Sequence, residues 1–242
     1  SEKRTQRADN KLMIFVTGDT HRLKDVKKLD LEHFPEQKML TRNDYLIIAG
    51  DFGAIWTGDE RDDEVLKFHE DHNYTTLFVA GNHENYDLLE QYPVEEWNGG
   101  MVRRIREHVL QLMNGYVFTI GGKKIFVMGG ATSTDRMFRK EGISWWPQEE
   151  PSSDVLLDAT WNLFDADNKV DYIITHTCPE KVRKNAFQTY NGFVEYSSGV
   201  EKYLDTVLTN VKYKKWFTGH IHIDREFADY KLRVLYNGIV KI

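Results

Sequence analysis

The sequence contains one cysteine, five prolines and no long apolar run, and these shortages exclude several kinds of protein. Because Cys178 is alone, no disulfide can form within the chain, so packing must stabilise the fold, as is typical of a reducing compartment. No apolar stretch approaches the roughly 20 residues that a membrane-spanning helix needs. An excess of positive charge is also missing, since 32 Lys and Arg stand against 38 Asp and Glu. We therefore expect neither a membrane nor long nucleic acid as a partner.

The first ten residues, SEKRTQRADN, are polar and lack the apolar centre of a signal peptide. They predict a flexible tail over 1–10 in a cytoplasmic protein. The whole 242-residue chain is 40% hydrophobic and shows neither an internal repeat nor a Gly/Ser linker. Such a chain is long enough for one large core, so we expect a single domain over 11–242 with no obligate protein partner.

Short apolar runs rich in β-branched and aromatic residues predict most of the secondary structure. Strands are expected over 12–17, 44–50, 75–81, 116–120, 124–130, 170–176, 214–220, 226–229 and 232–240. Helices are expected over 59–72, 151–164 and within 195–210, and Gly121-Gly122 predicts a tight hairpin. The apolar runs are continuous rather than alternating, which is typical of sheets covered on both faces. We predict an α/β fold, a layered sandwich of two mixed β-sheets flanked by helices.

Polar side chains follow five of these strands at the point where each strand ends. The five segments read TGDTH, GDFG, GNHE, HTCP and GHIH. They supply eight residues that can bind a metal or transfer a proton: Asp19, His21, Asp51, Asn82, His83, His176, His220 and His222. In open α/β sheets, ligands bind outside the carboxyl ends of the strands. The eight side chains are therefore expected at one rim of the fold.

Each segment taken alone has an ordinary structural explanation. A Gly-Asp pair after a strand is typical of a turn. Asn82 could cap a helix with Glu84 in its first turn, and a single histidine is often only a hydrogen-bond partner. These explanations do not predict the same arrangement after five strands, so the repetition favours one shared binding site.

The chemistry of the donors indicates which ligand the site would take. Imidazole and carboxylate groups with one amide oxygen suit manganese, iron or zinc, whereas calcium and magnesium favour oxygen ligands throughout. Seven ligands are too many for one catalytic ion with open positions, but they suit two ions that share a carboxylate. Two such ions can clamp a phosphate and lower the pKa of a water molecule. The sequence therefore predicts metal-dependent hydrolysis of a phosphate ester.

The order of the five motifs, from residue 18 to residue 222, resembles that of the calcineurin-like metallophosphoesterase superfamily. The resemblance implies two ligand sets joined by a bridging Asp51: Asp19, His21 and His222 for the first metal, and Asn82, His176 and His220 for the second. It also implies that His83 is not a ligand but contacts the phosphate and protonates the leaving oxygen. Glu84 is expected to support the turn by hydrogen bonds.

The chain departs from the serine/threonine protein phosphatases of that superfamily at Ala54 and Ile55, where those enzymes have an Asp and an Arg. Two segments, 131–151 and 178–196, combine cations with aromatic rings and are candidate substrate walls. Within them we select Arg136 as a substrate-binding residue that replaces the missing arginine. The alternative is that the tryptophans belong to the core and the cations to the solvated surface. Cys178 is interpreted as a buried structural thiol.

These observations favour a phosphatase acting on a small or protein phosphomonoester. The alternative is a phosphodiesterase or nuclease acting on nucleotides or other diesters. A non-catalytic scaffold with the same fold is disfavoured, because such a protein is expected to have lost ligands or the acid histidine.

Overall fold

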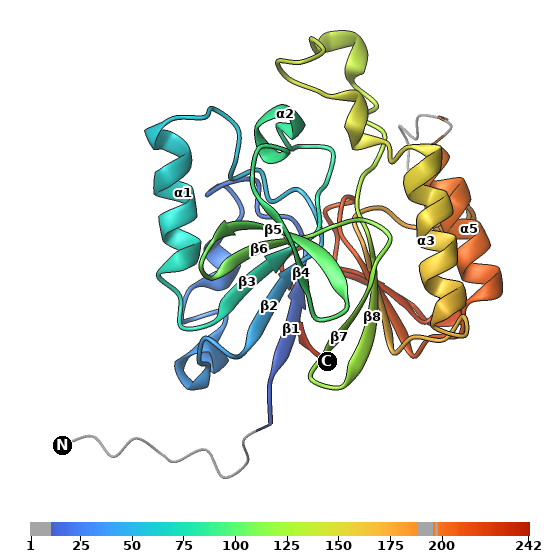
Figure 1. Ribbon diagram of the computed structural model, residues 1–242, viewed down its shortest axis with the longest axis horizontal. Helices are drawn as coiled ribbons and strands as arrows, with labels where there is room; N and C mark the ends of the chain where they lie inside the picture. The colour runs from blue at the N-terminus through green and yellow to red at the C-terminus, as the bar shows by residue number, and fades with distance from the viewer. Residues whose placement is uncertain (1–10, 188–195, 197) are drawn as a thin grey trace.

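The computed structural model describes residues 11–187, 196 and 198–242, so the predicted tail over 1–10 and part of segment 178–196 lie outside the described residues. Two mixed β-sheets pack face to face and helices cover their outer faces, as predicted (Figure 1). Of the helices in the described ranges, none combines the length and apolar character of a membrane span.

The seven-stranded sheet has four parallel strands at its centre. In spatial order its strands are β13 (Ile239–Lys241), β1 (Ile14–Thr17), β2 (Tyr45–Ile48), β3 (Thr75–Phe78), β6 (Val109–Leu112), β5 (Gly100–Arg106) and β4 (Val94–Trp97). β1, β2, β3 and β6 run parallel, whereas β13, β5 and β4 pair antiparallel with their neighbours. The carboxyl ends of the first three predicted strands therefore lie at one edge of this sheet.

The six-stranded sheet is arranged in the same way. Its order is β11 (Arg225–Phe227), β12 (Leu232–Val234), β10 (Lys215–Thr218), β9 (Tyr172–Thr175), β8 (Lys123–Met128) and β7 (Val117–Ile120). The four central strands are parallel, and the strand at each edge is antiparallel. β9 and β10, which precede the HTCP and GHIH segments, occupy the middle.

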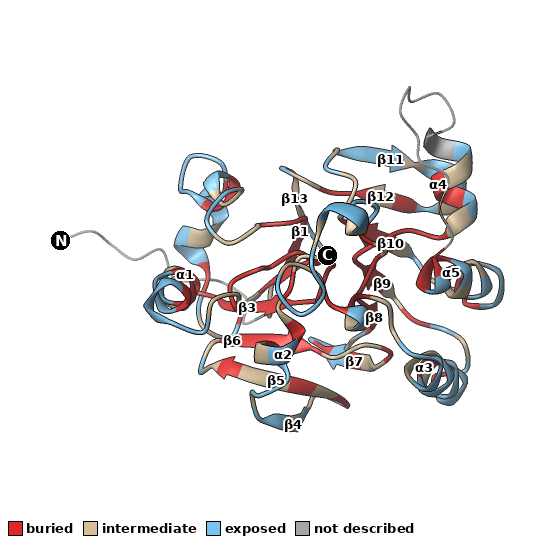
Figure 2. Ribbon diagram, turned by 90° about the horizontal axis from the view of Figure 1, so that it is seen from above, coloured by how far each residue is buried: buried red, intermediate tan, exposed pale blue. Residues whose placement is uncertain are grey.

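Helices cover the outer face of each sheet (Figures 1 and 2). They are α1 (Glu60–Glu70), α2 (Tyr86–Leu89), α3 (Ser153–Asp165), α4 (Glu180–Phe187) and α5 (Gly199–Asn210). Short 3-10 turns span Lys27–Leu29, Pro35–Met39, Arg136–Phe138, Pro147–Glu149 and Ala228–Tyr230. α1 and α2 pack on the seven-stranded sheet, and α3 and α5 pack on the six-stranded one.

Alternate residues of a central strand enter different hydrophobic clusters. Val127 and Ile174 lie between the two sheets, whereas their neighbours Phe126 and Ile173 lie beneath α3 and α5. All four side chains are fully buried. Because successive residues of a strand point to opposite faces, a strand covered on both sides must be apolar throughout. This explains the continuous apolar runs in the sequence.

Local signals in the sequence place two of the connections. Ser152 caps α3, its hydroxyl accepting a hydrogen bond from the Val155 amide. Gly121 and Gly122 have φ values of 57° and 75° and join β7 to β8. A two-residue hairpin with positive φ at both positions matches the twist of its strands, so the predicted hairpin is confirmed.

The extension β4–β6 of the seven-stranded sheet is absent from the sequence-based prediction. β4 is a partly exposed edge strand, and β5 carries Arg103, Arg104 and Arg106. A register shift between Arg104 and Arg106 also interrupts its alternation. The predicted strand 232–240 is in fact two strands in different sheets, because β12 pairs with β10 while β13 pairs with β1.

Candidate metal centre

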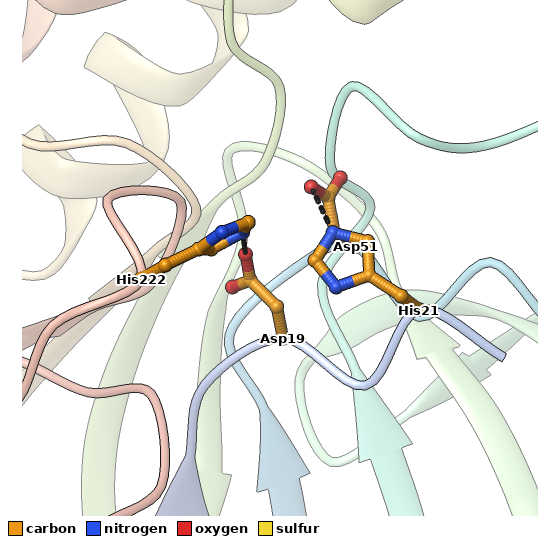
Figure 3. Close-up of side chains that lie close together, drawn as sticks. All are labelled: Asp19, His21, Asp51 and His222. Carbon is orange, nitrogen blue, oxygen red and sulfur yellow. Dashed lines mark ion pairs between the residues drawn. The ribbon is translucent and has the colours of Figure 1, made fainter. Parts of the chain in front are cut away.

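The loops after β1, β2, β9 and β10 bring their acidic and imidazole side chains together at one rim. The donor atoms form two groups, and within each group they all lie within 4.8 Å of one another. The first group consists of Asp19, His21, Asp51 and His222, and the second of Asp51, His176 and His220. Figure 3 shows the first group, with the side chains turned toward one another above the strands. Asp51 belongs to both groups, so it joins them into one cluster.

Two histidines of the first group face buried carboxylates. His21 Nε2 lies 3.3 Å from Asp51 Oδ2, and His222 Nε2 lies 2.9 Å from Asp19 Oδ2 (Figure 3). Both Oδ2 atoms are buried, and neither has a hydrogen-bond partner among the described residues. A buried carboxylate oxygen without a partner is costly, and a cation between these groups would satisfy both oxygens. The residues present thus fit a metal ion.

The second group lies deeper and includes the Asn82 amide. His176 Nε2 is 3.3 Å from Asp51 Oδ1 and 3.0 Å from Asn82 Oδ1. The His220 ring packs edge-on against the His176 ring with centroids 4.8 Å apart. Imidazole nitrogens and carbonyl-type oxygens therefore converge here as well, as in the first group.

Glycines of three motifs make room for side chains of the other motifs. A Cβ on Gly50 would lie 1.9 Å from His176 Nδ1, and one on Gly219 would lie 2.2 Å from Asp19 Oδ1. A Cβ on Gly81 would lie 2.1 Å from Asp51 Oδ1. These glycines are thus required by the close approach of strand-end loops to one another, beyond any role in a turn.

Four residues of the cluster adopt left-handed backbone conformations. The φ values are 45° for His21, 44° for Asp51, 67° for His220 and 55° for His222. For residues other than glycine this conformation is uncommon and costs about 1–3 kcal/mol at each position. It persists where the surrounding structure fixes it, and it clusters at functional sites. The backbone here is held in place to present these side chains.

The electrostatics of the cluster favour added positive charge. Burial by itself would lower the pKa of His176, but the carboxylates of Asp51 and Asp19 outweigh it and raise that pKa to about 9. Burial would also raise the pKa of Asp51, yet His176 and His21 hold it well below its usual range. Burial lowers the pKa of His220 to about 3. The two buried carboxylates thus create a negative potential, which favours a cation at this rim.

Neighbouring groups orient the imidazole rings. His21 Nδ1 lies 2.7 Å from Asp25 Oδ2, and His176 Nδ1 lies 3.0 Å from the Ala49 carbonyl oxygen. The His222 ring stacks on Tyr236, with centroids 4.8 Å apart and planes 19° from parallel. The Nδ1 contacts fix which nitrogen of His21 and His176 faces a metal, and the stacking fixes the plane of the His222 ring. No motif in the sequence pointed to Asp25 or Tyr236.

A chain of hydrogen bonds orients the Asn82 amide. Asn82 Nδ2 donates to Ser133 Oγ at 3.1 Å, and Ser133 Oγ donates to Glu149 Oε2 at 2.7 Å. The Asn82 oxygen is therefore the atom that faces His176. Glu84 accepts hydrogen bonds from the amides of Phe52 and Gly53 at 2.8 and 3.0 Å, so it supports the loop after β2 as expected.

His83 lies beside the cluster, and its neighbour is Arg139. The His83 amide donates to Asp51 Oδ1 at 2.7 Å. Arg139 Nη1 and Nη2 lie 3.4 Å from His83 Nδ1 and Nε2, so the guanidinium runs alongside the ring. Asp135 and the Ser144 carbonyl hold the guanidinium in place. Burial, joined by the charge of Arg139, lowers the pKa of His83 against the opposing charge of Asp51.

Arg136, the arginine selected from the sequence, has different partners. Its guanidinium forms an ion pair with the fully buried Glu149, with Nη2 2.5 Å from Oε1. It also lies over the Trp145 ring, 4.7 Å from the centroid. Arg136 thus supports the hydrogen-bonded chain behind Asn82, and Arg139 is the arginine beside His83. The two arginines differ in their tertiary contacts, which the sequence does not show.

Other residues noted in the sequence have structural surroundings. Ala54 and Ile55 are buried with α1 and α2 in one hydrophobic cluster. Trp146 is buried, and its indole nitrogen donates to Asp87. Arg183 forms an ion pair with buried Glu201 at 2.6 Å. Cys178 is fully buried, as expected.

Comparison with known proteins places these features in a family. A model of the calcineurin-like phosphoesterases matches residues 12–224. The search among curated proteins gives no match. Among solved structures, phosphopantetheinyl hydrolase (PptH) from Mycobacterium tuberculosis is 14% identical, with 93% of this chain and 88% of that one covered and a TM-score of 0.43. The calcineurin-like phosphoesterase YfkN from Bacillus subtilis is also 14% identical, with 95% and 84% covered and a TM-score of 0.42.

A candidate 5′-nucleotidase from Staphylococcus aureus has a TM-score of 0.50 and 17% identity. The alignment covers 95% of this chain but only half of that one, so the likeness concerns the fold alone. The family model covers most of the chain and includes all five motifs. The His/Asp cluster fits the metal chemistry that the family name implies. The chain belongs to the calcineurin-like phosphoesterases, a family of phosphoric ester hydrolases.

Proposed function

We propose that the chain is a phosphatase that hydrolyses phosphomonoesters at a two-metal centre bridged by Asp51. The observation that carries the proposal is the sharing of Asp51, whose two carboxylate oxygens face opposite groups. Oδ2 lies 3.3 Å from His21 Nε2, and Oδ1 lies 3.3 Å from His176 Nε2. A carboxylate with a histidine on each side is suited to bridging two cations.

The proposed ligands divide between the two groups. Asp19, His21, Asp51 and His222 would hold the first ion, and Asp51, Asn82, His176 and His220 would hold the second. Nitrogen and oxygen donors without thiolate favour manganese, iron or zinc. When bound, two such ions would neutralise phosphate charge and lower the pKa of a water molecule that serves as nucleophile.

Side chains of the protein would supply the remaining chemistry. His83 is placed beside the bridging carboxylate through its amide bond to Asp51 Oδ1 but is not itself in either donor group. We assign it the protonation of the leaving oxygen. The Arg139 guanidinium lies 3.4 Å from the His83 ring and could bind phosphate oxygens in a bidentate way. A phosphomonoester carries more negative charge than a diester, so a cation at this position favours the monoester.

The proposed substrate is a phosphorylated small molecule or protein. We also propose a reducing compartment such as the cytoplasm, which the lone buried Cys178 supports. The competing function is hydrolysis of phosphodiesters, including nucleotides.

The test is hydrolysis of a chromogenic phosphomonoester and the matching diester, side by side, by chelator-treated protein titrated with manganese. We expect metal-dependent cleavage with the monoester as the better substrate. A preference for the diester would overturn the monoesterase assignment and keep the family chemistry. Equal hydrolysis before and after metal removal would contradict the two-metal proposal.

A further inference from the structure

α3 (Ser153–Asp165) has apolar residues on its outward side as well as on its inward side. Ala159 and Leu163 are buried against the six-stranded sheet. Leu157, Trp161 and Phe164 face away from it and are 56%, 56% and 62% exposed. Figure 2 shows α3 at the periphery of the molecule, with its outer side open to solvent. The helix therefore offers a second apolar face that no described part of the chain covers.

These three exposed side chains form one continuous row. They follow the spacing i, i+4, i+7, which places them on one line of a helix with about 3.6 residues per turn. The rings of Trp161 and Phe164 are in edge-on contact, with centroids 6.0 Å apart. Single exposed apolar residues are common on protein surfaces, but a contiguous row is typical of a contact with another molecule. We call Leu157, Trp161 and Phe164 the α3 stripe.

Acidic residues accompany the α3 stripe. At the helical repeat, Asp154, Asp158 and Asp165 fall along one side of the stripe. Within the described ranges, none of the three carboxylates forms an ion pair or accepts a hydrogen bond. By contrast, Asp62 and Asp63 of α1 pair with Arg22 and Arg106. The surface of α3 thus combines an apolar row with a parallel row of unneutralised carboxylates.

We propose that the α3 stripe binds a basic amphipathic helix of a partner protein. Apolar side chains of that helix would cover Leu157, Trp161 and Phe164, with anchors at the i, i+3/i+4, i+7 spacing typical of helix recognition. Lys or Arg along its flank would pair with the carboxylates and so set its orientation. A second copy of this chain would bring like charges together, and an anionic membrane would be repelled. The charge pattern therefore selects a cationic protein segment.

The proposal is tested with the full chain and a defined probe, a fluorescently labelled Leu/Lys peptide of about 18 residues, long enough to form a helix on contact. Its leucines follow the i, i+3, i+4, i+7 pattern. A second peptide with Glu in place of every Lys tests the charge requirement. Binding is measured by fluorescence anisotropy at low and at high salt. We expect saturable, salt-sensitive binding of the Lys peptide and none of the Glu peptide.

Matched variants separate the α3 stripe from unspecific attraction to an acidic protein. Trp161→Ala is compared with Leu31→Ala, because Leu31 is also exposed but lies outside α3. Asp158→Asn is compared with Glu64→Gln on α1, an equal change of charge elsewhere. We expect Trp161→Ala to weaken binding about 30-fold or more, in the range of an aromatic hot spot. Asp158→Asn should weaken it a few-fold, and both controls should bind like the wild type.

Three results would overturn the proposal. They are equal binding by wild type and Trp161→Ala, no saturable binding by the wild type, and a concentration-dependent dimer that Trp161→Ala abolishes. The unfolding transition of each variant checks that it is folded, which is expected because Trp161 is solvent-exposed. The result does not depend on phosphoester hydrolysis, so the two proposals can fail separately.

Discussion

The two donor groups that share Asp51 differ in their access to solvent. In the second group, His176 is fully buried, Asn82 is almost so and His220 is half-buried. In the first, the His222 side chain is 46% exposed and the His21 side chain is 15% exposed. A buried donor set is held by the packing around it, whereas an exposed one relies on its loops. We therefore expect the second group to bind its ion more tightly and to release it more slowly.

The difference has a clear structural origin. His176 follows β9 in the middle of the six-stranded sheet, and its ring is hydrogen-bonded to Ala49 at the end of β2 in the other sheet. The second group is thus built where the two sheets meet. His222 lies in the loop between β10 and β11 and is supported by stacking on Tyr236. Its side chain is largely exposed, so less of the surrounding structure fixes its position.

The largest effect is expected for Asp51→Asn, because this change removes the feature that the two groups share. Loss of one negative charge should weaken the binding of both ions. The fall in turnover should therefore be larger than the loss caused by removing a single acid–base residue, which is about 10²–10⁴-fold. Metal content per chain and kcat are measured together. Two tightly bound ions in Asp51→Asn would show that the carboxylate does not bridge.

Removal of one histidine from each group tests the comparison directly. His220→Ala and His222→Ala should each lower metal affinity by more than the about 10–100-fold typical of a lost supporting contact. Excess manganese should restore more activity to His222→Ala, because water can replace a ligand at the more exposed position. Activity against metal concentration is the measurement. Equal rescue of both variants would break the distinction between the groups.

The next effect in size concerns His83, which belongs to neither donor group. His83→Ala should leave two ions bound, since the bond to Asp51 uses the backbone amide. Turnover should fall by about 10²–10⁴-fold. His33→Ala, at an exposed histidine paired with Asp30, is the control and should have wild-type turnover. Unchanged turnover of His83→Ala would remove this residue from its proposed role.

The smallest effect is expected for the two arginines of segment 131–151. Arg139→Ala should lower kcat/KM for the phosphomonoester by about 10–100-fold, the equivalent of one charged hydrogen bond, and change diester cleavage less. Arg136→Ala tests the residue selected from the sequence. It should act through Asn82 and weaken metal binding, with little change in the ratio of monoester to diester cleavage. If Arg136→Ala instead shifts that ratio and Arg139→Ala does not, the sequence-based selection was right.

The residue pattern alone was sufficient to predict the central part of the fold. The largely buried strands β1, β2, β3, β8, β9 and β10 contain or continue into apolar runs, and such runs are visible without any structure. β6 was missed although it is buried, because its run VLQL is short and contains a glutamine. β5 was missed because its charged residues lie on a partly exposed face and a register shift breaks the alternation. β13 was merged with β12, since sequence does not show which sheet a short strand joins. The single domain over 11–242 stays a prediction.

The candidate site was predictable for a related reason. Residues directly after parallel strands must meet at one edge, so motif order was enough to expect the cluster around Asp51. Asp25, Tyr236 and Arg139 reach the site from loops whose path depends on tertiary contacts. Nothing in their local sequence distinguishes Arg139 from Arg136. The four left-handed residues also escaped prediction because, although His and Asp are enriched in that conformation, tertiary contacts decide where they adopt it.

Under the proposed function, two metal ions held around Asp51 are required for phosphoester hydrolysis. The most direct measurement is a titration of chelator-treated protein with manganese in which bound metal and phosphomonoester hydrolysis are followed in the same samples. We expect the first equivalent to bind tightly with little hydrolysis, and activity to rise as the second equivalent binds. Full activity with one ion bound, or with none, would contradict the two-metal proposal.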